Sequence, residues 1–144
     1  MSTRAIIGYL DDDHSFKSIY LHSGGYPEHT GKILVGHYNT MEKIKELFSF
    51  GDMSSIGERI NPIGKHTFDN PEEGTCVYYS RDRGLAYDYY VRVITNYDFD
   101  DFCDDNLDLH DYVYLFMDGH WFVVNKDKER MLVTEVLQEN EKKG

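Results

Sequence analysis

Basic side chains are scarce in this chain of 144 residues, because 15 lysines and arginines stand against 26 aspartates and glutamates. The net charge of −11 argues against direct binding of nucleic acid, since that needs clustered lysine and arginine to displace counterions from phosphates. An acidic surface has two other uses. It keeps a small protein soluble, or it mimics nucleic acid and occupies a basic groove on a partner protein.

Cysteine and long apolar runs are also scarce. Cys76 and Cys103 are the two cysteines and match no paired metal motif, so we expect free thiols in a reducing compartment and no metal site. No apolar run approaches the roughly 18 residues of a membrane span, and the N-terminus lacks the pattern of a signal peptide. We expect a soluble, cytoplasmic protein with no membrane partner.

Motifs for catalysis or for a cofactor are absent too. The sequence has no Gly-x-Ser-x-Gly elbow, no Walker loop, no dinucleotide fingerprint and no zincin helix. Seven histidines offer bases, but no spacing pairs them with a nucleophile, and His29 and His37 are too far apart for the i, i+4 pair of a helical metal site. We expect no cofactor and assign no catalytic residue. A small enzyme with His22 or His29 as its base stays an alternative.

The periodicity predicts one α+β domain over residues 1–144 with a largely antiparallel sheet. Residues 4–10 and 16–22 form an N-terminal β-hairpin in this prediction. Two helices follow it, over residues 28–38 and 41–48. The second begins at a cap, Asn39 or Thr40.

The second half of the chain is richer in strand signals. Asp118-Gly119 tolerates the positive φ of a type I′ turn and predicts a hairpin. The expected elements are a long loop over 52–74 with one short strand at 66–68, a strand at 75–80, a turn at 81–84, a β-rich or helical segment at 85–95, the hairpin strands 112–117 and 120–124, an edge strand or short helix at 130–137, and a frayed tail at 138–144.

The stretch SIYLHSGGYPEHTGK, residues 18–32, connects a predicted strand to a predicted helix. Its Gly-Gly pair breaks the strand, and Pro27 suits the first turn of a helix. The N–H groups at a helix start are available to an anion. We interpret this junction first as a structural device and second as a wall of a binding site.

Arginine is rare, with six in the chain, and two of these bracket Asp82 in the turn SRDRG. Arginine forks match phosphate and carboxylate geometry, which favours a ligand site. An equally good interpretation is that one arginine pairs with Asp82 or another carboxylate and stabilises the turn. Arginine, histidine and the polar tips of the 12 tyrosines together suit a nucleotide. The candidate ligand-binding residues are Arg4, Tyr20, His22, Tyr26, His29, Arg81 and Arg83.

Seven aspartates lie within residues 98–111. The spacing lacks the central Gly and terminal Glu of an EF-hand loop. We expect an acidic loop that is either solvated or aimed at a basic partner. The candidate partner-binding residues are Asp98, Asp100, Asp101, Asp104 and Asp105.

Four segments, MSTRAIIGYL, KSIYLHSGGYPEHTGKILVGHY, FGDMSSIG and YYSRDRG, resemble in this order a family of small, mostly uncharacterised proteins of phages and mobile elements. In the family pattern Trp and Asp stand where this chain has Ser23 and Gly24. The resemblance implies a phage protein that acts in the cytoplasm of an infected bacterial cell, commonly by blocking host defence.

Three functions follow as hypotheses. The first is sequestration of a nucleotide-like immune signal without chemistry, and the second is inhibition of a host defence protein by an acidic nucleic-acid mimic. The third is an enzyme that degrades a nucleotide signal. A homo-oligomer is compatible with the aromatic-rich strands, which offer edges for pairing.

Overall fold

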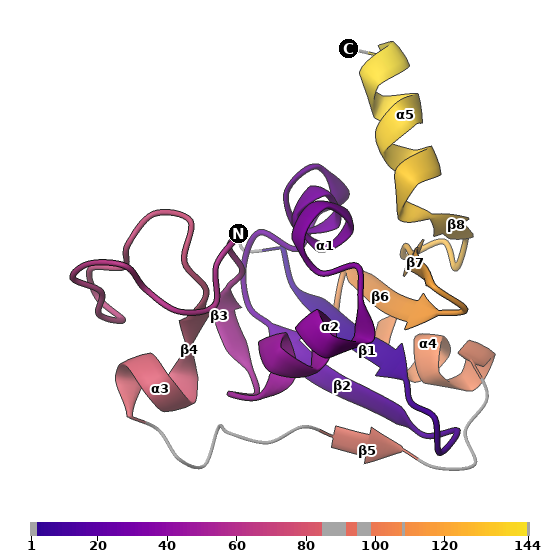
Figure 1. Ribbon diagram of the computed structural model, residues 1–144. Coiled ribbons are helices and arrows are strands. Elements are labelled where there is room, and N and C mark those ends of the chain that lie inside the picture. Colours follow the sequence, from indigo (N-terminus) through magenta and orange to yellow (C-terminus); the bar gives the residue numbers. More distant parts are fainter. Residues whose placement is uncertain (1–2, 85–91, 95–98, 108, 144) are drawn as a thin grey trace.

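The computed structural model describes residues 3–84, 92–94, 99–107 and 109–143 (Figure 1). One mixed sheet runs through the molecule in the order β4-β3-β2-β1-β6-β7-β8, and β5 pairs with the first residues of β2. The strands are β1 (Ala5–Leu10), β2 (Phe16–Leu21), β3 (Met53–Ser55), β4 (Val77–Tyr78), β5 (Arg92–Ile94), β6 (Tyr112–Met117), β7 (His120–Val124) and β8 (Arg130–Leu132). The helical segments are η1 (Pro27–Gly31), α1 (Lys32–His37), α2 (Met41–Phe48), α3 (Tyr79–Arg83), α4 (Phe99–Leu107) and α5 (Val133–Lys143).

Strand β1 is the centre of the sheet. It pairs antiparallel with β2 and parallel with β6, so that Ile7 lies between Ile19 and Tyr114. Five of its six residues are buried, which is typical of a strand that is covered on both faces.

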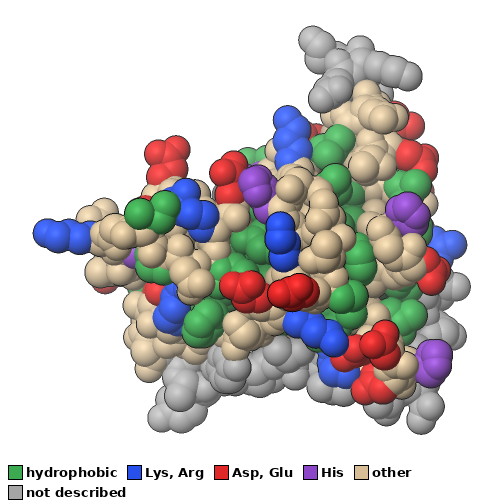
Figure 2. All heavy atoms as spheres, viewed as in Figure 1, with side chains coloured by type: hydrophobic (Ala, Val, Ile, Leu, Met, Phe, Trp, Pro, Cys, Tyr) green, Lys and Arg blue, Asp and Glu red, His purple; other side chains and the backbone are tan. Residues whose placement is uncertain are grey.

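Helices cover the two faces of the sheet. On one face, Ile7 and Tyr114 pack with Leu34 of α1, Leu47 of α2 and Val133 of α5. Figure 1 shows α1 and α2 in front of the strands. On this face basic and acidic side chains are interspersed and do not form a patch of one sign (Figure 2).

The opposite face is covered by α4. Ile6 of β1, Phe16 of β2 and Leu115 of β6 pack there against Phe102 and Leu107 of α4. The rings of Phe16 and Phe102 are stacked with their centroids 5.4 Å apart. Burial of these aromatic and aliphatic side chains fixes α4 on the sheet.

Several local predictions are confirmed. The N-terminal hairpin forms, and Thr40 caps α2 by accepting a hydrogen bond from the N–H of Lys43. Asp118 and Gly119 both have positive φ, 54° and 79°, as a type I′ turn requires, and they join β6 to β7. Both cysteines are free thiols and both are buried.

The prediction of a largely antiparallel sheet followed by two helices is correct only as far as α+β. The β1–β6 and β2–β3 pairings are parallel, so the sheet is mixed. Residues 28–38 do not form one helix, because a π-helical turn, η1, runs into the short helix α1. Three further helices, α3, α4 and α5, come later in the chain.

Two strand assignments are wrong. Residues 66–68 form no strand, because Thr67 and Asn70 exchange hydrogen bonds in a local turn. The strand of this region is β3, where Met53 pairs with Leu21. The strand predicted for residues 75–80 ends at Tyr78, and α3 replaces its end and most of the predicted turn at 81–84.

The acidic segment 98–111 is not a loop over most of its length. Phe102, Cys103 and Leu107 are buried in the core, and they lie on one stripe of α4 because three to four residues make a helical turn. The aspartates of this segment interrupt the apolar signal in the sequence, and Asp101 and Asp104 are exposed on the outer side of the amphipathic helix.

The C-terminal segment contains both alternatives that the sequence left open, a short strand β8 and then helix α5. Helix α5 extends away from the sheet (Figure 1). It includes residues 138–143, and the expected fraying of that tail stays a prediction. Most of residues 85–95, apart from β5, lie outside the described residues.

Candidate functional site

Three of the predicted ligand-binding residues gather at the end of β2, on the α4 face of the sheet. The hydroxyl of Tyr20 is hydrogen-bonded to Nδ1 of His22 at 2.8 Å. The ring of His110, which follows α4, lies against Tyr20 with the centroids 5.5 Å apart. Arg4, which is exposed, immediately precedes β1, and its positive charge lowers the pKa of the Tyr20 hydroxyl. We call Arg4, Tyr20, His22 and His110 the polar cluster.

Backbone hydrogen bonds hold this cluster together. The carbonyl of Arg4 accepts the N–H groups of Asp111 and Tyr112, and the Arg4 N–H donates to the Asp111 carboxylate at 3.0 Å. The parallel pairing of β1 with β6 thus brings residue 4 beside residues 110–112.

Charges of both signs surround Tyr20. Burial raises the pKa of the Tyr20 hydroxyl, whereas the positive charge of Arg4 lowers it and the carboxylate of Asp52 raises it. Asp52 is buried and accepts the backbone N–H of Tyr20 at 2.8 Å, so its charge is partly satisfied inside the protein.

The histidines of the cluster are oriented by their Nδ1 atoms. Nδ1 of His110 lies 2.8 Å from the carbonyl oxygen of Asn106, which only accepts hydrogen bonds, so Nδ1 carries a proton. In the neutral ring Nε2 is then a lone-pair acceptor. Between the Tyr20 hydroxyl and Nδ1 of His22 either atom can be the donor, because the protonation of the His22 ring sets the direction of this bond.

Arg81 is not part of this cluster in the structure. Its guanidinium donates to the carbonyls of Ile60 and Cys76 and to the carboxylate of Asp82. It also stacks on the rings of Phe50 and Tyr78. These contacts match the alternative reading, in which arginine pins the turn.

The remaining predicted residues are dispersed. Arg83 is exposed and lies over the ring of Phe68, with 5.2 Å to the centroid. Tyr26 immediately precedes η1 and His29 lies within it, and their ring centroids are 6.0 Å apart. The His29 ring also packs against Gly24. The start of loop 52–74 is bonded to the polar cluster, because Asp52 and Met53 accept the N–H groups of Tyr20 and His22. Farther along, the loop meets Arg81 of α3 at the carbonyl of Ile60.

Of the five acidic candidates, the structure describes the side chains of Asp101 and Asp104. Asp98 lies outside the described residues, and the side chains of Asp100 and Asp105 are not described. Asp101 and Asp104 are exposed on α4. The Asp104 carboxylate pairs with Lys128 at 3.2 Å.

His110 is the residue of the cluster that sequence reasoning missed. It lies 90 positions after Tyr20 in the acidic segment, and no local pattern connects the two. Its signal is topological, since only the parallel β1–β6 pairing brings the chain before β6 to the end of β2.

Comparisons with protein-family models, with curated proteins and with solved structures find no match for this chain. In the described part of the chain, no helix has the length and apolar character that crossing a membrane requires.

Proposed function

We propose that this protein binds a phosphate-bearing, nucleotide-like molecule at the polar cluster, and that it serves phage counter-defence by sequestering an immune signal of the bacterial host. The observation that carries the proposal is the gathering of a phenol and two imidazoles, with the imidazole centroids 5.5 and 6.0 Å from that of Tyr20. The backbone of the exposed Arg4 is bonded to Asp111, next to His110. Arginine and histidine donate to phosphate oxygens, and aromatic rings stack on bases. The phage context rests on the family resemblance of the sequence.

The first test is capture from a lysate. Purified protein is incubated with lysate from cells whose defence system is active, washed and denatured, and the released small molecules are analysed by mass spectrometry. An unaltered nucleotide supports sequestration. A protein that releases nothing while a basic host protein co-purifies would favour the acidic-mimic alternative, with exposed Asp101 and Asp104 as the next residues to change.

The second test assigns the ligand to the polar cluster. Calorimetry with the released nucleotide compares the variants Arg4→Gln and His22→Gln with the controls Arg83→Gln and His37→Gln. Each cluster variant should weaken binding about tenfold, as expected for a lost hydrogen bond to a charged group. The controls, which carry the same changes at exposed positions elsewhere, should bind as the wild type does. Equal weakening in both sets would place the ligand elsewhere.

The hydrogen bonds that orient the two histidines favour a second candidate function, hydrolysis of a phosphodiester. Nε2 of His110 would take a proton from an attacking water, whose oxygen bonds to phosphorus. His22 would act as the imidazolium, with Nδ1–H donating to the Tyr20 oxygen. Its Nε2 proton would pass to the leaving oxygen as the old P–O bond breaks, which leaves a neutral imidazole. A cleaved product that accumulates with time, and is lost in His110→Gln, would replace sequestration by this activity.

A further inference from the structure

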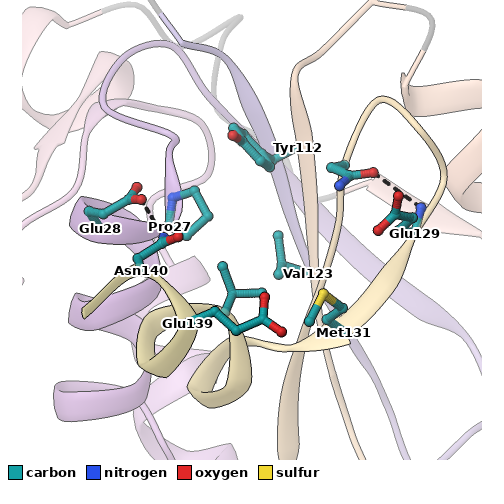
Figure 3. Close-up of a pocket in the computed structure, with 10 residues that line it drawn as sticks. Pro27, Glu28, Tyr112, Val123, Glu129, Met131, Glu139 and Asn140 are labelled. Atoms are coloured by element: carbon teal, nitrogen blue, oxygen red, sulfur yellow. Dashed lines mark hydrogen bonds between the residues drawn. The ribbon is translucent and has the colours of Figure 1, made fainter. Parts of the chain in front are cut away.

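A second site lies on the other face of the sheet from the polar cluster. A pocket of about 270 Å³ opens between η1, β7, the turn before β8 and α5 (Figure 3). The lining residues that decide its chemistry are Val123, Met131 and Val136, which are apolar, and Glu28, Glu129 and Glu139, which are acidic. We call it the α5 pocket.

The floor of the α5 pocket is apolar. Val123 is only 4% exposed, and Met131 lies near it (Figure 3). Val136 of α5 lines the same pocket. Pro27 and the ring of Tyr112 complete the wall. Such a floor favours an apolar segment of a ligand because burying it releases water from both surfaces.

Carboxylates from three separate elements line the same pocket. Glu28 comes from η1, Glu129 from the turn before β8, and Glu139 from α5. The amide of Asn140 donates a hydrogen bond to Glu28 and ties α5 to η1. No lysine or arginine is among the lining residues, so the negative charges of the pocket reinforce one another in front of a low-dielectric wall.

The basic side chains of the neighbouring turn all point to the opposite face. Lys126 donates to the carbonyl of Leu107 at 2.8 Å, and Lys128 pairs with Asp104, so both are bound at α4. The guanidinium of Arg130 lies over the ring of Phe122. The turn therefore separates its charges, with the cations on the α4 face and Glu129 in the α5 pocket.

The spacing of the carboxylates decides which kind of cation fits. Within the described residues, no group of three or more His, Cys, Asp or Glu side chains is close enough to hold a metal ion. The three glutamates therefore do not surround one compact ion. A ligand that carries separated positive charges joined by apolar atoms would meet these carboxylates and the apolar floor together.

We infer that the α5 pocket binds a linear polyamine, with ammonium groups at Glu28, Glu129 and Glu139 and the methylene chain on Val123, Met131 and Val136. The pairing follows charge complementarity with the rim and hydrophobic contact with the floor. Burial and the carboxylates of Glu28 and Asp111 raise the pKa of the Tyr112 hydroxyl, which is consistent with a negative field in this pocket. The site is independent of the polar cluster and of the function proposed for it.

Calorimetry with spermidine as the probe tests this inference. We expect one binding site per chain, tighter for spermidine than for the shorter diamine putrescine, and weakened by salt because the charges are partly exposed. The variants Glu129→Gln and Glu139→Gln should each weaken binding about twofold to fivefold. The controls Asp127→Asn, in the same turn, and Glu135→Gln, on the same helix, remove the same charge outside the pocket and should leave the affinity unchanged.

A second readout locates the ligand. In protein labelled at the methionine methyl groups, the Met131 resonance, assigned with Met131→Leu, should shift on titration with spermidine and saturate at the calorimetric affinity. Magnesium at equal ionic strength should leave it in place. Equal effects of all four carboxylate substitutions, equal binding of magnesium, or a Met131 signal that does not move would overturn the inference and show general counterion binding.

Discussion

Nε2 of His66 lies 3.1 Å from Oδ2 of Asp82, and both side chains are almost completely buried, at 1% and 5% exposure. Nδ1 of His66 accepts the backbone N–H of Glu72 at 3.0 Å, so the proton of the neutral ring is on Nε2 and faces Asp82, although the angle falls short of a well-aligned hydrogen bond. Both nitrogens thus contact the protein itself. His66 connects the long loop to α3 and is a structural residue.

Arg81 should prove structural in the same way. Replacing it with lysine keeps the charge but loses the fork that meets Ile60, Cys76 and Asp82. The buried Asp82 carboxylate then keeps the hydrogen bond from the Tyr78 N–H but loses the two from the guanidinium. We expect Arg81→Lys to lower the free energy of unfolding by about 2 kcal/mol, measured by urea denaturation. Arg83→Lys is the matched control, expected within about 0.5 kcal/mol. Equal stability of the two variants would contradict this assignment.

Glu72 should make stability depend on pH. Hydrogen bonds from the Thr75 hydroxyl and then from the N–H groups of Ile63 and Gly64 lower the pKa of Glu72 to about 2 from 4.5. A carboxyl with a lowered folded-state pKa contributes stability that is full above its unfolded pKa and is lost as pH falls toward the folded one. The stability difference between wild type and Glu72→Gln should therefore shrink between pH 4.5 and pH 2.

The neighbouring exposed Glu73 supplies the control for this experiment. Glu73→Gln removes the same charge beside the same loop and should show little pH-dependent difference from the wild type. Urea midpoints at a series of pH values measure both variants. If the stability difference between wild type and Glu72→Gln stayed constant down to pH 2, these hydrogen bonds would not be what lowers the pKa of Glu72.

Removing the hydroxyl should lower the free energy of unfolding much more at Tyr114 than at Tyr112, two tyrosines of β6. Tyr114 is fully buried and donates to the carbonyl of Gly25 at 2.6 Å, whereas Tyr112 is half-buried at the α5 pocket. Tyr114→Phe leaves a buried carbonyl without that donor and should cost about 1 to 2 kcal/mol, while Tyr112→Phe should cost less than about 0.5 kcal/mol. Thermal and urea unfolding measure both, and the reverse order would refute the assignment.

Two glycine-to-alanine substitutions should act with opposite sign. A Cβ on Gly25 would lie 2.9 Å from both the Thr3 carbonyl oxygen and Ala5 Cβ, whereas a Cβ on Gly36 of α1 would meet nothing within 4 Å. Gly25→Ala should lower the free energy of unfolding by about 1 to 3 kcal/mol. Gly36→Ala should raise it by about 0.5 to 1 kcal/mol because alanine favours the helix. Calorimetric melting compares them, and two shifts of the same sign would contradict the packing at Gly25.

Sequence reasoning reached the elements that short-range chemistry dictates. Thr40 caps its helix and Asp118-Gly119 turns its hairpin, because each depends on the residues immediately beside it. Helix α4 was missed because its aspartates interrupt the apolar stripe of Phe102, Cys103 and Leu107. The parallel pairings of β1 with β6 and of β2 with β3 join segments far apart in the sequence. No pattern in the neighbouring residues predicts them.

The same division holds for the candidate site. Tyr20 and His22 are two positions apart on one strand, so their shared face follows from strand geometry, and Arg4 comes with the adjacent strand. The role of Arg81 depends on carbonyls 5 and 21 positions away, and the place of His110 depends on the pairing of β1 with β6. The pairing of Arg81 with Asp82 is one of the two interpretations of the SRDRG turn, whereas the two carbonyls and the place of His110 could not be derived from spacing in the sequence.

The parallel pairing of β1 with β6 has a consequence for how the chain folds. The second edge of the central strand, residues 5–10, is covered only when residues 112–117 pair with it. Contacts between residues so far apart in the sequence slow folding. During synthesis the N-terminal hairpin is therefore exposed until most of the chain has left the ribosome. Its apolar edge is the segment most in need of protection in that interval.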